Sequence, residues 1–141
     1  MLVVDASAVT ELILARPAAE DAVRRLREHD FDLHAPQLLD IEVLNAIRRV
    51  LARGDASAER AEQAVEDLRD LPIERYPHEA LVGRIWELRE SLSAYDAAYV
   101  ALAEGLSDHD AHLLTADGRL ARAVASHSAV PVVLTIAAAD R

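Results

Sequence analysis

Five short runs with a strand-like pattern are spaced along the chain. Runs of three to five residues rich in Val, Ile and Leu are typical of strands buried in a parallel sheet. The first run stops at Asp5, where a helical repeat begins at once, so we expect Asp5 at the carboxyl end of a strand. The run at 72–76 carries the weakest pattern. The predicted strands are residues 2–4, 31–34, 72–76, 113–115 and 132–134.

Between these runs, apolar residues recur every three to four positions, which is the period of an amphipathic helix. Ser57 and Ser93 stand where helix N-caps are expected, Ser7 lies near the start of the first helix, and Gly54 follows the longest one as a C-cap. Helices alternating with short strands imply βαβ units, so the predicted fold is α/β with a central parallel sheet of four to five strands. The predicted helices run from about residue 7 to before Pro17 and over 18–28, 36–53, 57–68, 77–90, 93–105 and 117–125.

The size and composition of the chain fit one domain over residues 1–141. The length of 141 residues is near the commonest domain size, and 52% of the residues are apolar with few aromatics. There is no Cys, which excludes disulfides and thiolate metal sites. The N-terminus lacks the pattern of a secretory signal, and no apolar run approaches the roughly 20 residues that span a bilayer. We therefore expect a cytoplasmic protein that does not bind membranes.

The charge of the chain narrows the classes of function. The formal net charge is −10, and all 15 basic residues are Arg. The absence of Lys excludes a P-loop and disfavours a receiver-type phosphorylation domain, since both use a Lys near the phosphate. An acidic surface also disfavours tight non-specific binding to nucleic acid, although bound metal ions would supply positive charge that a formal count omits. The same acidic surplus favours a basic protein partner.

Two acids follow predicted strands directly. Asp5 ends the first strand, and Asp117 lies two residues after the strand at 113–115. In an open parallel sheet, ligands bind outside the carboxyl ends of the strands, so both positions favour a functional role. Asp is also common at helix caps and turns, and that structural interpretation is open for each of them alone.

Two further acids lie on helices that are otherwise largely apolar. Asp96 has almost no charged neighbours, and Glu42 shares one helix face with Asn45 and Arg49. Asp40 is turned from Glu42 by about 200° at roughly 100° per residue, so it lies on another face. A solvated face or a favourable interaction with the helix dipole is the alternative interpretation.

Four carboxylates in one place repel one another and have raised pKa values unless a cation compensates them. Hard cations such as Mg²⁺ and Mn²⁺ prefer oxygen ligands, and this chain offers no thiolate and only scattered His. A carboxylate cluster that holds such ions can activate water and stabilise a phosphodiester as it is cleaved. The pattern therefore favours a metal-dependent nuclease.

Four ordered segments carry a resemblance to a known family. They are VVDASA at 3–8, EVLNAIRR at 42–49, YDAAYVALA at 95–103 and LLTADGRL at 113–120, and together they resemble the PIN domain, more narrowly the VapC toxins of bacterial toxin–antitoxin pairs. The resemblance implies an α/β/α sandwich and an endoribonuclease that depends on Mg²⁺ or Mn²⁺ and cleaves RNA by metal-activated water. It implies catalytic and metal-binding roles for Asp5, Glu42, Asp96 and Asp117, hydroxyl helpers in Ser7 and Thr115, and a polar neighbour in Asn45.

The same resemblance implies a cognate VapB-type antitoxin, which would block the acidic pocket with a basic side chain, and a homodimer of the toxin. Two alternatives share the carboxylates: a metal-dependent phosphoesterase on another substrate, and an inactive PIN-like module that only binds a partner or RNA. The segment 107–112, which reads SDHDAH, departs from the short apolar connection that the family usually has there. We expect a solvated loop, with a second metal site as the alternative.

Overall fold

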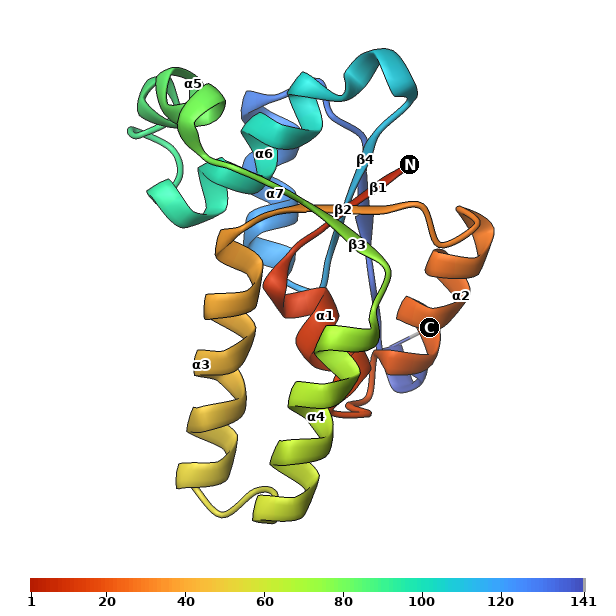
Figure 1. The fold of residues 1–141 in the computed structure, drawn as a ribbon. Coiled ribbons are helices and arrows are strands. Elements are labelled where there is room, and N and C mark those ends of the chain that lie inside the picture. Colours follow the sequence, from red (N-terminus) through yellow and green to blue (C-terminus); the bar gives the residue numbers. More distant parts are fainter. Residues whose placement is uncertain (141) are drawn as a thin grey trace.

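A computed structural model describes residues 1–140 and contains one five-stranded sheet. All four strand pairs are parallel, in the order β3-β2-β1-β4-β5, so the N-terminal strand lies at the centre (Figure 1). The predicted α/β class and parallel sheet are confirmed. The strands are β1 (Leu2–Val4), β2 (Leu33–Pro36), β3 (Ile73–Tyr76), β4 (His112–Thr115) and β5 (Val132–Leu134).

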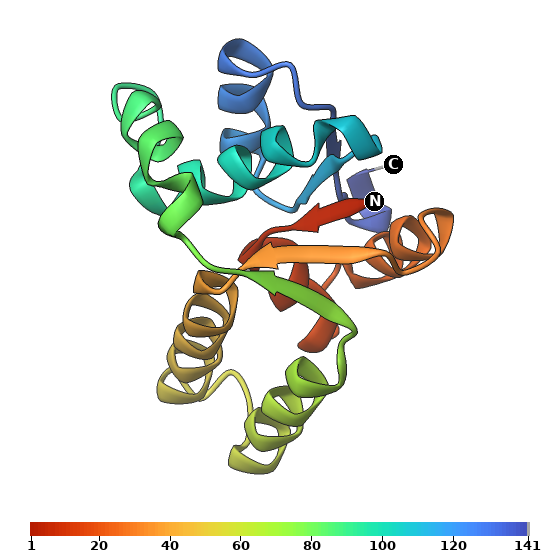
Figure 2. The same cartoon turned by 45° about the horizontal axis from the view of Figure 1, so that its top comes forward.

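Helices cover both faces of the sheet. The helices α1 to α4 follow β1 and β2, and α5 to α7 follow β3 and β4, with the sheet between the two groups (Figure 2). Because parallel crossovers are right-handed, connections that run in opposite directions along the sheet place their helices on opposite faces. The helices are α1 (Ala6–Ile13), α2 (Ala19–Glu28), α3 (Leu38–Ala52), α4 (Ala58–Asp70), α5 (Val82–Glu87), α6 (Ala94–Gly105) and α7 (Gly118–His127), with 3₁₀ turns at Glu79–Leu81, Ser107–His109 and Ala138–Asp140.

The direction of winding reverses at β1. The chain passes from β1 to β2 and β3 on one side, then returns to place β4 on the other side of β1. The carboxyl ends of β1 and β4 therefore flank a topological switch point, where open α/β sheets form their ligand crevice. Both strands are buried along nearly their whole length, which fixes the positions of the residues that follow them.

Several boundaries differ from the sequence prediction. The second strand starts at Leu33 instead of residue 31, because Asp30 and Phe31 have positive φ angles of 53° and 54° and form a turn. Pro36 belongs to that strand and is paired with Tyr76, so the following helix starts at Leu38. The segment 77–90 is not one helix but a 3₁₀ turn and the short α5. No helix within residues 1–140 is long and apolar enough to cross a membrane.

Candidate active site

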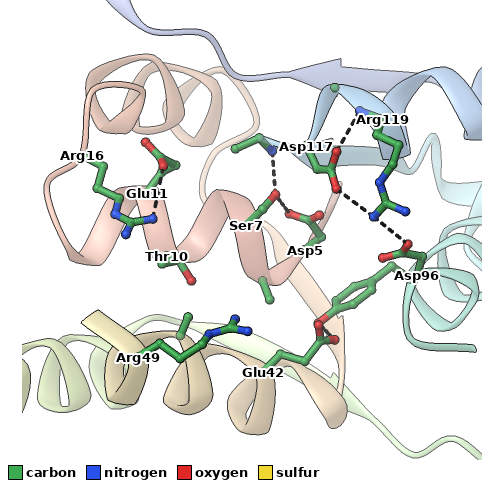
Figure 3. Close-up of a pocket in the computed structure, with 15 residues that line it drawn as sticks. Asp5, Ser7, Thr10, Glu11, Arg16, Glu42, Arg49, Asp96, Asp117 and Arg119 are labelled. Atoms are coloured by element: carbon green, nitrogen blue, oxygen red, sulfur yellow. Dashed lines mark hydrogen bonds and ion pairs between the residues drawn. The ribbon is translucent and has the colours of Figure 1, made fainter. Parts of the chain in front are cut away.

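A cavity of about 570 Å³ opens at the carboxyl ends of β1 and β4, between α1, α3, α6 and the start of α7. The four acids singled out in the sequence all line it, together with three arginines (Figure 3). The cavity therefore brings together groups from four separate parts of the chain. Its charged lining residues are Asp5, Glu11, Arg16, Glu42, Arg49, Asp96, Asp117 and Arg119.

Asp5 is the most buried of the four acids. It follows β1 and caps α1, with one carboxylate oxygen accepting hydrogen bonds from the Ala8 backbone N–H at 2.9 Å and the Ser7 hydroxyl at 2.7 Å. Its other oxygen accepts a hydrogen bond from the Thr115 hydroxyl at 2.8 Å. Burial raises the pKa of Asp5 to about 6, although the three hydrogen bonds oppose that shift. The carboxylate of Asp5 is thus held in one orientation by neutral hydrogen-bond donors, and no cationic side chain within residues 1–140 forms an ion pair with it.

The hydroxyls of Ser7 and Thr115 both donate hydrogen bonds to the carboxylate of Asp5. Ser7 Oγ accepts a hydrogen bond from the Ala116 backbone N–H at 2.9 Å, and Thr115 Oγ1 accepts one from the Asp117 backbone N–H at 3.0 Å. The two hydroxyl oxygens lie 3.2 Å apart. This network joins the end of β1 to the end of β4 and fixes how Asp5 and the Asp117 backbone are placed relative to each other.

Glu42 extends from α3 toward the same space and is half-buried. Its Oε1 accepts a hydrogen bond from the Tyr99 hydroxyl of α6 at 3.0 Å. Burial is the main cause that raises the pKa of Glu42, and the negative charges of Asp96 and Asp5 add to the shift. The sequence prediction gave Tyr99 no role. Its position three residues after Asp96 on the same helix was the signal that could have found it.

Asp96 and Asp117 share one cation. The Nη2 atom of Arg119 lies 3.5 Å from the carboxylate of Asp96 and 3.2 Å from that of Asp117. Burial raises the pKa of Asp96 in spite of Arg119. For Asp117, burial acts in the same direction but is outweighed by hydrogen bonds from the backbone N–H groups of Leu120 and Arg119, and its pKa is lowered. Asp117 is therefore both the N-cap of α7 and part of the acidic cavity wall.

The remaining predicted neighbours lie outside the acid cluster. The side-chain oxygen of Asn45 accepts hydrogen bonds from Arg48 at 3.1 and 3.2 Å on the exposed side of α3, and Asn45 does not line the cavity. The cavity face of α3 carries Ala46 in its place. Asp40 forms a bidentate ion pair with Arg75 of β3 at 2.7 and 2.9 Å, on another face of the helix from Glu42, as the rotation of the helix predicts.

The donor set of the cavity suits a hard divalent cation. All of its acidic donors are carboxylate oxygens, and three of the four acids have raised pKa values, which a cation would relieve. Within residues 1–140, no three acidic or imidazole groups stand close enough to hold one ion among them, either here or in the segment 107–112. A hard divalent cation that keeps several of its waters needs only one or two carboxylates as direct protein ligands.

Comparison with known proteins agrees with this geometry. The PIN domain family model matches residues 2–125. Ribonuclease VapC12 of Mycobacterium tuberculosis is 39% identical over 133 residues, which cover 94% of this chain and 99% of that protein. Ribonuclease VapC9 of the same organism is 42% identical over 120 residues, covering 85% of this chain and 88% of the relative.

Solved structures show the same fold at lower identity. PAE2754 from Pyrobaculum aerophilum matches with a TM-score of 0.66 and 22% identity, covering 93% of this chain and 81% of that one. A structure of FitAB bound to an IR36 DNA fragment matches with a TM-score of 0.60 and 19% identity over 95% and 94% of the two chains. The family-model match and the extent of the sequence identity show that this chain belongs to the PIN domain family and, within it, to the VapC ribonucleases.

Proposed function

We propose that this chain is an endoribonuclease toxin of a VapBC pair that cleaves RNA with the help of Mg²⁺ or Mn²⁺ at the carboxylates Asp5, Glu42, Asp96 and Asp117. Relatives that span nearly the whole chain are named ribonucleases, and the four acids line one cavity at the switch point of the sheet. Residues 1–141 would act as a single domain.

The central position of Asp96 carries this proposal. The negative charge of Asp96 raises the pKa values of both Asp5 and Glu42, and Asp117 in turn raises that of Asp96. Asp96 thus interacts electrostatically with each of the other three acids, and it comes from the opposite face of the sheet to α1 and α3. An ion that Asp96 shares with Asp5 would relieve the repulsion between these two acids.

The protein side of the reaction follows from the fixed donors. A bound divalent cation would supply activation of water and neutralisation of charge on the phosphodiester. Asp5 would be held by Ser7, Ala8 and Thr115 with its orientation set before the cation arrives. Glu42 would accept a proton from the attacking water, and its raised pKa and its hydrogen bond from Tyr99 support this role.

A basic antitoxin would fit the electrostatics of the cavity. The chain has a formal net charge of −10, and Arg119 already occupies the space between Asp96 and Asp117. A basic side chain of a VapB-type partner inserted among these acids would compete with a divalent ion for the same charge. The toxin is proposed to act as a homodimer, as the family resemblance implies.

The test is RNA cleavage by the purified protein with Mg²⁺ or Mn²⁺ and with EDTA. Asp5→Asn and Asp96→Asn should abolish cleavage while the folded state is kept, and the exposed loop variant Asp108→Asn should cleave like the wild type. Cleavage that continues in EDTA would contradict the proposal. Equal hydrolysis of RNA and of a small generic phosphodiester would favour the phosphoesterase alternative. The failure of any divalent ion to bind at millimolar concentration would favour an inactive binding module.

A further inference from the structure

The cavity is polarised along its length. The four acids gather at one end with Arg119 among them, where β1, β4, α6 and α7 meet (Figure 3). At the other end lie Arg49 and the ion pair of Arg16 with Glu11. A ligand that fills this space must therefore carry or recruit a cation at one end and present negative charge at the other. A metal-bound phosphodiester with a further phosphate along the chain has this distribution of charge.

Arg49 is the cation best placed to receive that second phosphate. It follows Glu42 and Ala46 on the cavity face of α3, and no hydrogen bond or ion pair joins its guanidinium to any of residues 1–140. The other arginines of the cavity are engaged, since Arg16 lies 3.8 Å from Glu11 and Arg119 contacts Asp96 and Asp117. The Arg49 guanidinium is thus available to an anion.

Thr10 supplies an independent polar group on the opposite wall. It lies on α1, one turn beyond Ser7, and is only 5% exposed. Its hydroxyl has no hydrogen-bond partner among the described residues, and it points into the cavity between the acids and the Arg49 side (Figure 3). A hydroxyl in this position is satisfied only by water or by a ligand in the cavity.

We propose that Thr10 and Arg49 bind the backbone phosphate next to the one that is cleaved. This inference rests on the proposed ribonuclease function and adds a substrate-binding subsite to it. A guanidinium and a hydroxyl contact phosphate oxygens and not base edges, so the subsite holds the strand in place without reading its sequence. Arg49 and Thr10 are positioning residues for the scissile bond.

The subsite is tested by RNA binding in an Asp5→Asn background, where the strand is bound in Mn²⁺ without turnover. Arg49→Met should weaken the binding of a single-stranded oligoribonucleotide by roughly tenfold or more. A plot of the logarithm of the binding constant against the logarithm of the salt concentration has a negative slope. Arg49→Met should make this slope less steep by about 0.7, the value for one lost phosphate contact on a single strand. Arg49→Lys should restore most of the affinity, and Thr10→Val should weaken binding by a smaller factor.

The matched control is Arg48→Met, since Arg48 lies on the same helix but faces Asn45 outside the cavity. It should leave both affinity and salt slope close to those of the parent. In the otherwise wild-type enzyme, Arg49→Met should raise KM far more than it lowers kcat. If Arg49→Met and Arg48→Met bind RNA with equal affinity and equal salt dependence, the subsite does not exist. The same result is expected if Arg49 contacts an acidic protein partner instead of RNA. If the wild type shows no metal-dependent cleavage of RNA, the proposed function is wrong. The binding comparison between Arg49→Met and Arg48→Met would still test the subsite by itself.

Discussion

The Tyr99 hydroxyl donates a hydrogen bond to Glu42 Oε1 at 3.0 Å and so joins α6 to α3. Tyr99 is only 2% exposed, and its ring is packed in the core. The hydroxyl therefore has a fixed position, and it fixes one oxygen of the half-buried Glu42 in turn. The helices that carry Glu42 and Asp96 are thus joined by a hydrogen bond from Tyr99 of α6 to the carboxylate of Glu42.

Replacing Tyr99 by Phe removes this hydrogen bond without changing the packing of the ring. We expect a loss of about 1 kcal/mol in the free energy of unfolding, the usual net value of one such bond. The pKa of Glu42 should rise further, because the hydrogen bond from Tyr99 lowers it in the native protein. Urea unfolding and carboxylate titration by NMR check both effects. The exposed Tyr95→Phe is the control, and an equal response of the two variants would contradict the proposed link.

Asp5→Asn should stabilise the metal-free protein at pH 7. The pKa of Asp5 is raised from 3.8 to about 6, so the folded state binds the proton more tightly than the unfolded state and loses stability as pH rises through 6. Removing the charge should recover about 1–3 kcal/mol at pH 7, since one pKa unit corresponds to about 1.4 kcal/mol. Thermal unfolding in EDTA measures this gain. Added Mn²⁺ should stabilise the wild type more than the variant, which keeps the other three acids. A variant less stable than the wild type in EDTA would contradict the electrostatic cost assigned to burial of this carboxylate.

We expect the hydroxyl of Thr115 to contribute more to the free energy of unfolding than its methyl group does. It is fully buried and contacts Asp5, Ser7 and the Asp117 backbone N–H through one oxygen atom. Thr115→Val leaves a carboxylate oxygen and an N–H group without their partner, which should cost about 2–4 kcal/mol of unfolding free energy. Thr115→Ser keeps the oxygen and should cost about 1 kcal/mol for the lost methyl. Denaturant unfolding ranks the two, and a serine variant as unstable as the valine variant would refute this assignment.

The positions of the four acids could be predicted because each follows from a local pattern. Asp5 and Asp117 come after buried strands, and the parallel sheet brings the ends of β1 and β4 together. Glu42 and Asp96 interrupt apolar helices. The local sequence pattern does not predict how each helix is rotated against the sheet, because that rotation depends on packing between distant segments. The face of α3 that lines the cavity therefore includes Ala46 instead of Asn45.

Boundaries and partners were harder to predict for the same reason. Pro36 is typical of a helix start, but pairing with Tyr76 keeps it in β2. The roles of Tyr99 and Thr10 depend on which side chains lie across the cavity, and neither residue belongs to a short motif. Ser7 and Thr115 were identified as hydroxyl helpers from the family resemblance, and only the structure shows that both contact the carboxylate of Asp5.

The ion pair between Arg84 and Glu104 gives a pH-dependent prediction away from the cavity. Glu104 accepts hydrogen bonds from Arg84 at 2.7 and 3.1 Å and from the Ser128 hydroxyl at 2.7 Å, which joins α5 and the end of α7 to α6. The bond from Arg84 is the main cause that lowers the pKa of Glu104 below 4.5. The folded state therefore gains stability above pH 4.5 and loses it as pH falls through the lowered pKa.

Glu104→Gln should accordingly reduce the free energy of unfolding by about 1 kcal/mol at pH 7, as expected for a partly buried charged hydrogen bond. The difference from the wild type should shrink toward zero as the pH falls through the lowered pKa, below which the native carboxyl group is also neutral. Glu87 contacts the same arginine at 2.9 Å but is 66% exposed, so Glu87→Gln should change stability far less. Urea unfolding of the three proteins between pH 3 and pH 7 makes the comparison. A Glu104→Gln deficit that stays constant over this range would mean that the pair stabilises the fold through packing and not through charge.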